Sequence, residues 1–341
     1  MYTILAADIG ATNCRFALFQ AEPDDPARPV LALLRERWLP AAEYAEFRHV
    51  LRFLCEAGSN AFLPGKNDTP ALAVLAPAGP VQGDSCRVSN LPWLIRSSDV
   101  QAELGIQDVF LLNDFAAQAY SCLLPEQIEA VPLLPGTPVP GAPLAVAGAG
   151  TGFGQALLLD AGEDVPGARS ASASKAALLS RLRRAQVLPS EGGHCDFPFT
   201  GKEEFAFAEF VRQSAGIDRV VGDTLASGSG LAHIFAFLTG ERLSPAEVTG
   251  RIDSCPQALE WFARFYGRIC RNYVLSTLAL GGLFITGGMA LRVPALSHPA
   301  FAREFHLSAG QGELLRAVPV HHIRNPQAGL WGAALYGLLH M

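Results

Sequence analysis

Two titratable side chains lie three residues apart in Glu191-Gly192-Gly193-His194, where they could bind a small polar molecule. A carboxylate accepts hydrogen bonds from hydroxyl groups, and a neutral imidazole accepts or donates one, so the pair suits a sugar ring. Because adjacent glycines disfavour helix, we do not expect the two side chains at helical i, i+3 positions. The glycines instead let the backbone bend close to a ligand. The alternative is a solvated surface turn.

Asn113 and Asp114 form a second polar pair, directly after the apolar run Val109–Leu112. The run predicts a buried strand, and in open α/β sheets ligands collect at the carboxyl ends of strands. The pair is therefore a candidate ligand contact. The alternative for Asp114 is an Asx turn that only ends the strand.

Three glycine-bearing turns follow predicted strands, at Asp8–Thr12, Gly148–Gly154 and Gly287-Gly288. None has the spacing of G-x-x-x-x-G-K-[ST] or G-x-G-x-x-G, so each alone predicts only a turn. Together they suggest that backbone N–H groups from both domains line a phosphate trough. Asp8, the first residue of the first turn, would suit a hydrated Mg²⁺, because this ion keeps its waters and takes few carboxylates.

The elements that must position these residues alternate between strands and helices, which predicts an α/β architecture. We expect strands over residues 2–8, 14–19, 31–39, 72–75, 109–112 and 144–146. Apolar periodicity and capping residues predict helices over 42–57, from Ser98 to Gly105, from a Thr200–Glu203 capping box to Ser214, from a Ser244–Glu247 capping box, and over 256–278.

Two segments are expected to be irregular. Residues 133–143, rich in Pro and Gly, predict a loop or linker. Residues 169–190 carry basic residues and no acid, and predict a solvated loop with a short helix from Lys175 to Arg184. The alternative for this basic segment is a lid or a partner site.

Length and composition limit the class of protein. A chain of 341 residues predicts two domains, and a net charge of −6 argues against a nucleic-acid partner. Seven scattered cysteines without a CxxC pair suggest reduced thiols.

No secretory signal is visible, so we expect a cytoplasmic protein. Residues 272–289 lack charge, but four glycines divide them, so we expect a helix end and a short strand and no membrane partner.

The chain resembles the bacterial glucokinase family of the actin-like sugar kinase superfamily over nearly its whole length. The glycine turns alone would indicate only the superfamily, and the specific part is the Glu-Gly-Gly-His block after the Asn-Asp pair. The motifs that carry the resemblance are Asp8–Arg15, Leu112–Phe115, Gly148–Gly154, Glu191–Phe197, Ile285–Gly288 and Asn325-Pro326.

The resemblance implies a two-domain α/β protein of the actin-like (ribonuclease H-like) fold, with a cleft between the domains. The small domain would comprise residues 1–124 and 324–341, and the large domain residues 125–323. The resemblance also implies ATP-dependent phosphorylation of D-glucose at the 6-hydroxyl, with ATP and Mg²⁺, by a homodimer. The domains would close on the sugar and so limit ATP hydrolysis.

Residue roles follow from the resemblance, motif by motif. Asp114 would be the catalytic base, and Asn113, Glu191 and His194 would hold sugar hydroxyls. Asp8 would serve the metal, and Gly287 and Gly288 would lie near the adenosine. The phosphates would be held by Ala7, Asp8, Ile9, Gly10, Ala11, Thr12, Gly150, Thr151 and Gly152.

The sequence departs from the family pattern at three places. Ala11 replaces a second glycine and disfavours a positive φ, so the phosphate turn is expected to differ slightly. Asp223 stands where the family has a sugar-binding glutamate, and its shorter side chain could change affinity or sugar choice. The basic segment 169–190 resembles an insertion.

Three alternatives therefore stay open. The chain could be a kinase for another hexose or amino sugar, or a sugar-binding regulator without turnover. His194, Cys195 and Asp196 could instead bind a metal, although the clustered-cysteine zinc motif of the related ROK sugar kinases is absent.

Overall fold

The computed structural model describes residues 2–22, 30–56, 62–63, 69–159, 179 and 182–341. The chain divides into two compact units. Unit 1 comprises Met1–Ile128, Ala161–Val187 and Gln327–Met341, and unit 2 comprises Glu129–Asp160 and Leu188–Pro326. The predicted boundaries after residues 124 and 323 lie after residues 128 and 326 in the structure. The prediction that 125–323 form one continuous domain was wrong, because Ala161–Val187 belong to unit 1.

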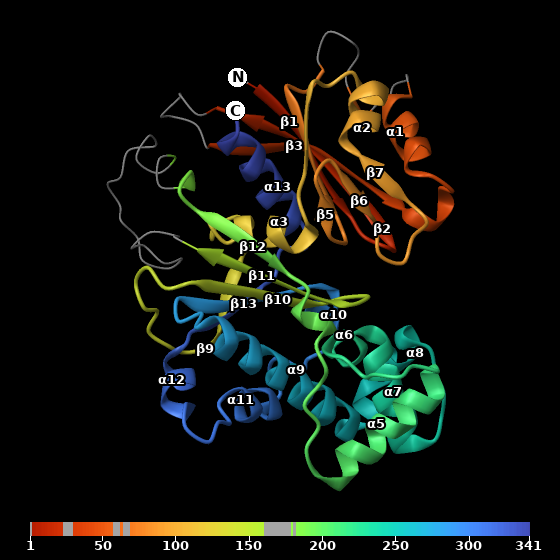
Figure 1. Ribbon diagram of the computed structural model, residues 1–341, viewed down its shortest axis with the longest axis vertical. Helices are drawn as coiled ribbons and strands as arrows, with labels where there is room; N and C mark the ends of the chain where they lie inside the picture. Colours follow the sequence, from red (N-terminus) through yellow and green to blue (C-terminus); the bar gives the residue numbers. More distant parts are fainter. Residues whose placement is uncertain (1, 23–29, 57–61, 64–68, 160–178, 180–181) are drawn as a thin grey trace. The chain divides into compact units, whose positions relative to one another are not determined.

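Unit 1 is built on a five-stranded sheet of order β3-β2-β1-β4-β8. Figure 1 labels β1, β2 and β3 of this sheet. Its strands are β1 (Tyr2–Ile9), β2 (Asn13–Ala21), β3 (Leu31–Pro40), β4 (Leu72–Pro77) and β8 (Asp108–Leu111). β2 is antiparallel to both β1 and β3, whereas β1, β4 and β8 run parallel. All five strands confirm the sequence prediction. Three short strands, β5 (Val81–Gln82), β6 (Ser85–Arg87) and β7 (Leu94–Arg96), form a second sheet.

Helices cover both faces of the five-stranded sheet. Alternate residues of β1 point to opposite faces, so Leu5 packs in the cluster that contains Val50 of α1 (Phe47–Cys55) and Val100 of α2 (Ser97–Leu104). The neighbouring Ile4 lies on the other face, near Gly337 of α13 (Ala328–Leu339). The short helix α3 (Asp114–Ser121) packs beside α13.

For α1 and α2, the predicted N-terminal ends were wrong. The helix expected from Ala42 begins at Phe47, because Ala41–Glu43 form a separate 3₁₀ turn and Tyr44 is extended. Ser98 does not cap α2, since Arg96 is the N-cap residue and Ser98 lies inside the first turn. The predicted end is confirmed, because Gly105 follows the helix with φ 68°.

Unit 2 is built on a six-stranded sheet of order β12-β11-β10-β13-β14-β9, and only the first two residues of β12, Gln186 and Val187, are assigned to unit 1. β10 is antiparallel to β11 and parallel to β13, which in turn is parallel to β14. In unit 1, β1 is likewise antiparallel to the strand that follows it, β2, and parallel to β4. The two units therefore share this arrangement of strands. The strands are β9 (Ala130–Leu134), β10 (Leu144–Ala149), β11 (Phe153–Leu159), β12 (Gln186–Ser190), β13 (Gly282–Thr286) and β14 (Val320–Ile323).

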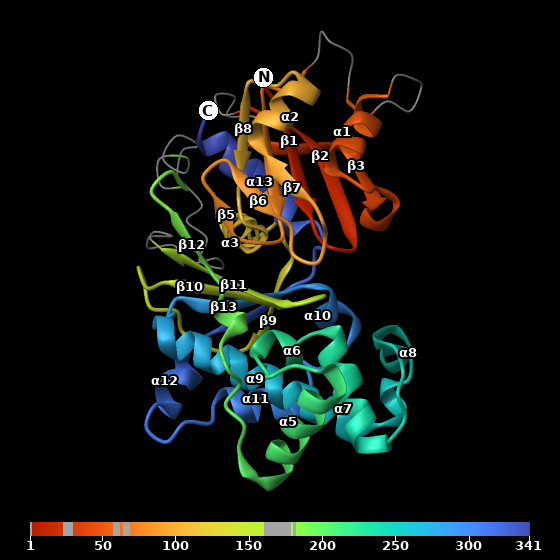
Figure 2. The same cartoon turned by 45° about the vertical axis from the view of Figure 1, so that its right-hand side comes forward.

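The helices of unit 2 gather around α9 (Pro256–Thr277), which lies on the same side of the sheet as α11 (Figure 2). α9 confirms the predicted helix over 256–278, and its aromatic stripe is buried in the core of this unit. The other helices are α5 (Gly201–Ala215), α6 (Gly222–Leu225), α7 (Gly228–Thr239), α8 (Pro245–Gly250), α10 (Gly288–Arg292), α11 (Pro299–Phe305) and α12 (Gly312–Ala317).

Some predictions for unit 2 were wrong. The predicted loop or linker over 133–143 is a loop from residue 135 onward, but its first two residues belong to β9, which pairs with β14, and it links no separate units. Thr200 does not form a capping box with Glu203, because its N–H donates to Glu204 Oε2 at 2.7 Å. β12 was not predicted. Most of the expected helix over 175–184 lies outside the described residues.

Other predictions for unit 2 are confirmed. Ser244 and Glu247 form the expected capping box of α8. The uncharged segment 272–289 contains the end of α9 and the short strand β13. Across the described ranges, no helix is both long enough and apolar enough to cross a bilayer. All seven cysteines are free.

Gly332 of α13 determines how closely α13 approaches α3. A Cβ atom on Gly332 would lie 1.7 Å from the Ala117 carbonyl oxygen, which belongs to the backbone of α3. Only a residue without a side chain can occupy this position, because a helix backbone cannot move aside as a flexible side chain can. The packing of α13 therefore helps to place the helix that begins at Asp114.

We predict that Gly332→Ala destabilises the protein by about 3 kcal/mol, because the new methyl group would overlap with the backbone of α3. Thermal or urea unfolding measures the effect. Gly250→Ala is the matched control, since Gly250 also lies in a helix but a Cβ atom added there would have no neighbour within 4 Å. Equal stability of the two variants would contradict the assigned packing of α13 on α3.

Candidate active site

Asn113 is the N-cap residue of α3 and fixes the start of that helix. Its Oδ1 accepts hydrogen bonds from the N–H groups of Phe115 at 3.0 Å and Ala116 at 3.1 Å. Its Nδ2 donates to the Gly79 carbonyl oxygen and to Asp114 Oδ1, both at 3.0 Å. The amide group thus joins the helix start, a neighbouring turn and the Asp114 carboxylate. The Asx-type role considered for Asp114 is performed by Asn113.

Asp114 is the first residue of α3 and is half-buried. A carboxylate in the first turn of a helix is favoured by the positive end of the helix dipole. Its Oδ1 also accepts the hydrogen bond from Asn113. The carboxylate therefore has a defined direction at the end of β8, where the sequence placed it.

Asp8 lies near the end of β1, close to α13 and α3. A Cβ atom on Gly329 would lie 3.4 Å from Asp8 Oδ2 and 2.9 Å from Gln118 Nε2. Arg15 Nη1 is 3.5 Å from Asp8 Oδ2, and its guanidinium lies 4.2 Å from the centre of the Trp38 ring. Burial raises the pKa of the Asp8 carboxyl, and the positive charge of Arg15 opposes this increase only in part.

The turn after β1 accommodates alanine without backbone strain. Gly10 N–H donates to the Asn13 carbonyl oxygen at 3.0 Å, and neither Gly10 nor Ala11 has a positive φ. The methyl group of Ala11 therefore imposes no left-handed conformation, which was the concern raised by the missing glycine. Ala7 and Ile9 are fully buried, so only their backbone groups could face a ligand.

Glu191 and His194 lie side by side on an exposed loop of unit 2. His194 Nε2 is 3.6 Å from Glu191 Oε2, and the two side chains are 63% and 59% exposed. The expectation that they avoid helical spacing was wrong, because residues 192–194 form one 3₁₀ turn in which His194 N–H donates to the Glu191 carbonyl oxygen. That single turn brings the two side chains together.

Of the two glycines between Glu191 and His194, Gly193 is required by the packing of the protein itself. A Cβ atom on Gly193 would lie 2.1 Å from the Phe153 carbonyl oxygen, and one on Gly192 would lie 2.3 Å from Gln155 Oε1. The loop therefore rests directly on β11. Contact with the backbone of β11 explains Gly193 without any reference to a ligand, whereas the neighbour of Gly192 is the end of a side chain.

The glycine turn between β10 and β11 lies beside two other predicted segments. Gly150 N–H donates to the Gly152 carbonyl oxygen at 2.7 Å, and Phe153 N–H donates to Asp223 Oδ1 at 2.5 Å. A Cβ atom on Gly287 would lie 2.4 Å from the Ala149 carbonyl oxygen. The turn at 150–152, Gly287 and Asp223 thus gather at one end of the sheet of unit 2. Gly288 follows as the first residue of α10.

The structure brings the predicted residues together in two sets, one in each unit. The unit 1 set comprises Ala7, Asp8, Ile9, Gly10, Ala11, Thr12, Asn113 and Asp114. The unit 2 set comprises Gly150, Thr151, Gly152, Glu191, His194, Asp223, Gly287 and Gly288. A cluster of three or more His, Cys, Asp or Glu residues able to hold a metal is absent from the described part of the chain. Asp196, considered as a metal ligand, forms an ion pair with Arg219.

Tyr266 supports this site, although no sequence motif identified it as a site residue. Its hydroxyl oxygen accepts a hydrogen bond from Ala149 N–H at 3.2 Å, just before the glycine turn, and its ring packs edge-on against Phe153. In the sequence it is one aromatic residue of an apolar helix, and no local signal separates it from the others.

Both units pair an antiparallel hairpin with further parallel strands, and both carry candidate ligand-binding turns at strand ends. This architecture is the two-domain α/β fold of the actin-like class, and the similar solved structures of this fold include sugar kinases. The structure is similar to a glucokinase from an Antarctic psychrotroph, with a TM-score of 0.74 and 27% identity over 100% of this chain and 99% of that chain. A ROK hexokinase from Thermus thermophilus shares the fold, with a TM-score of 0.59 and 18% identity over 98% and 97% of the two chains.

The sequence comparisons identify the family within that class. The profile of the Glucokinase family matches residues 5–340, and the chain belongs to this family. It is 31% identical to a glucokinase of Mesorhizobium japonicum over 98% of this chain and 91% of the relative. It is 34% identical to a glucokinase of Stenotrophomonas maltophilia over 98% and 94% of the two chains. The predicted family is confirmed, and the chain is a transferase.

We predict that Asp8→Asn raises the melting temperature at pH 7 by about 2 °C. Because burial raises the pKa of Asp8, folding disfavours its ionised form, and this penalty is fully present above the raised pKa. The advantage of asparagine should therefore shrink as the pH falls towards the ordinary value of 3.8. Thermal melting at several pH values measures it, with the exposed Asp108→Asn as control. A lower melting temperature at pH 7 would contradict the prediction.

Proposed function

We propose that this chain transfers the γ-phosphoryl group of ATP to the 6-hydroxyl of D-glucose, giving glucose 6-phosphate and ADP at the entry to glycolysis. The observation that carries the proposal is the Asp114 carboxylate, held by Asn113 at the end of β8 in a chain of the glucokinase family. A carboxylate so directed can accept the proton of an alcohol.

The chemistry requires little covalent assistance. The sugar O6–H gives its proton to Asp114 as the O6–P bond forms and the bond from Pγ to the β-phosphate bridging oxygen breaks, and ADP leaves with that electron pair. Such transfers depend mainly on positioning and on stabilising charge at the phosphates. Glu191 and His194 are exposed and 3.6 Å apart, so both can reach neighbouring hydroxyls of one sugar.

Backbone groups and one carboxylate are suited to the nucleotide. The turns at 8–12 and 150–152 would offer N–H groups to the phosphates, and Gly287 and Gly288 would lie near the adenosine. The family implies ATP and a divalent metal ion. Asp8 fits a hydrated Mg²⁺, because this ion takes few carboxylates and keeps several waters. When bound, the metal would neutralise charge on the phosphates.

Asp223 and Asn113 are proposed sugar ligands that already have partners in the protein. Asp223 Oδ1 accepts a hydrogen bond from Phe153 N–H, so this side chain also joins α6 to the glycine turn. Asn113 contributes to the site at least by holding Asp114. The cytoplasmic location, the homodimer and the closing of a cleft stay predictions from the resemblance. The alternatives of another sugar kinase or a regulator are not favoured, because relatives matched over their full length are glucokinases.

Coupled ADP release with a panel of hexoses tests the proposal. We expect ATP-dependent turnover with glucose that clearly exceeds turnover with mannose, fructose, galactose and N-acetylglucosamine. Omitting Mg²⁺ or adding EDTA should stop the reaction. Preference for another sugar, or glucose binding without turnover, would overturn the proposal.

We predict that Asp114→Asn lowers kcat by at least about 100-fold, because the amide cannot accept the proton of the sugar hydroxyl. Glucose affinity, measured by calorimetry without ATP, should stay within about twofold, since the side chain keeps its size and its hydrogen bond with Asn113 can persist. Asp108→Asn, at the other end of β8 and exposed, is the control. A kcat near that of the wild type would remove Asp114 from the role of base.

A further inference from the structure

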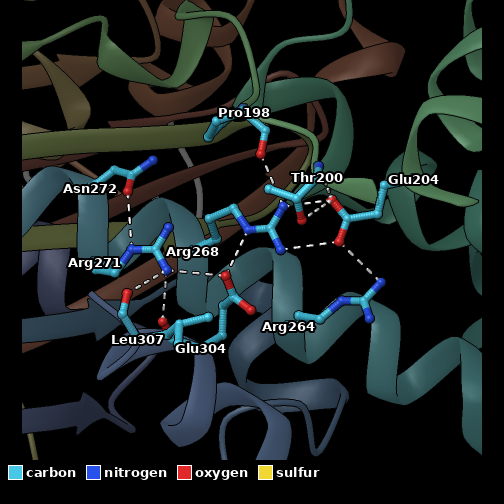
Figure 3. A network of polar contacts seen from close by, with 9 residues as sticks. All are labelled: Pro198, Thr200, Glu204, Arg264, Arg268, Arg271, Asn272, Glu304 and Leu307. Carbon is cyan, nitrogen blue, oxygen red and sulfur yellow. Dashed lines mark hydrogen bonds and ion pairs between the residues drawn. The ribbon is translucent and has the colours of Figure 1, made fainter. Parts of the chain in front are cut away.

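A buried ion network joins three helices of unit 2 around Arg268 of α9 (Figure 3). Arg268 Nη1 and Nη2 donate to the two carboxylate oxygens of Glu204 in α5, at 2.6 and 3.0 Å. Its Nε donates to Glu304 Oε1 in α11 at 2.7 Å. The side chains of Arg268, Glu204 and Glu304 are 4%, 5% and 7% exposed. Arg264 and Arg271 join the network at its edges.

The same network holds the chain segment that leaves the Glu191–His194 loop. Arg268 Nη1 donates to the Pro198 carbonyl oxygen at 2.9 Å, and its guanidinium lies 5.4 Å from the centre of the Phe197 ring. Two residues further on, Thr200 N–H donates to Glu204 Oε2 at 2.7 Å. Three positions between 197 and 200 are therefore attached to Arg268 or to its partner Glu204.

The other side of this segment is attached to the start of α6. Phe197 N–H donates to the Val220 carbonyl oxygen at 3.1 Å, and Gly222 N–H donates to the Cys195 carbonyl oxygen at 3.2 Å. The backbone after His194 is thus fixed from both sides. Because the Glu191 and His194 side chains are themselves mostly exposed, the backbone places them: the contact of Gly193 with β11 on one side and the segment after His194 on the other.

Stability alone is a poor explanation for the network. Removing two carboxylates and a guanidinium from water carries a large desolvation penalty, and apolar residues of similar volume often replace such groups without loss of stability. What apolar residues cannot provide is a forked donor that bonds two helices and a backbone carbonyl at once. The geometry favours a role in positioning.

We propose that Arg268 is a positioning residue for the sugar site, which holds the Glu191–His194 loop through Phe197, Pro198 and Glu204. The inference rests on the proposed function, because it assigns the loop to the sugar. A misplacement of about 1 Å can cost a binding or catalytic group about 100-fold, so a displaced loop would weaken sugar binding.

The test combines Arg268→Lys with Glu191→Gln in a double-mutant cycle. Lysine keeps the positive charge but lacks the fork, so it cannot bond Glu204, Glu304 and Pro198 together. Glu191→Gln keeps the size of the side chain and removes its charge. Arg303→Ala is the matched control, because Arg303 forms an ion pair with Glu260 that also links α11 to α9 but is exposed.

We expect Arg268→Lys to raise the glucose KM about tenfold and to leave the ATP KM within about twofold. Because Arg268 acts partly through Glu191, the effect of Arg268→Lys on the glucose KM should be smaller in the Glu191→Gln background than in the wild type. Arg303→Ala should leave both KM values unchanged. Hydrogen exchange of the peptide covering 195–204, without substrates, should become faster in Arg268→Lys.

Several results would overturn the inference. One is an unchanged glucose KM in folded Arg268→Lys, and another is multiplication of the two single effects in the double variant. If Arg268→Lys does not fold, Glu204→Gln takes its place, with the same expectations. Rapid exchange of the Phe197 and Thr200 amides in the wild-type protein would also overturn it. If the wild type does not phosphorylate glucose, the proposed function fails, whereas the exchange result still tests the attachment of the loop.

Discussion

Close approach of one backbone to another, at positions with no room for a side chain, is the constraint on which both units depend. In unit 1, Gly332 lets α13 lie against the carbonyl of Ala117 in α3. In unit 2, Gly193 lets the Glu191–His194 loop lie against β11. Such contacts fix the position of one segment relative to the other, because a backbone atom cannot rotate away as a side chain can. The polar groups of each set are placed by these contacts.

The two sets of site residues differ in how their side chains are held. Asp114 is half-buried and directed by Asn113, and Asp8 is held beside Arg15 with its carboxyl pKa raised by burial. Glu191 and His194 are mostly exposed, and the 3₁₀ turn between them provides their geometry. Exposed side chains can adjust to a ligand, whereas a base needs a fixed direction. In the proposed reaction, the fixed Asp114 is the base, and the exposed Glu191 and His194 bind the sugar, which agrees with this difference in burial.

Helix α9 connects the parts of unit 2 that belong to the candidate site. Tyr266 accepts a hydrogen bond from the backbone before the glycine turn, and Arg268 donates one to the segment after the Glu191–His194 loop. Ile269 lies close to Gly222, next to Asp223. The aromatic residues along this helix are buried in the core of unit 2. The same helix also supports three neighbouring functional segments, through residues that its periodicity does not distinguish.

The sequence by itself determined the strands of the five-stranded sheet, the long helix α9, the positions of the glycine turns and the family. These follow from local apolar patterns and from motifs whose residues are contiguous. Tertiary structure decided what depends on residues far apart in the chain. Thr200 pairs with Glu204 and not Glu203, because Arg268, 64 residues beyond Glu204, holds that carboxylate in the core. Likewise, Gly193 in the Glu191–His194 loop is explained by β11, which is distant in sequence, and a local pattern carries no information about such a neighbour.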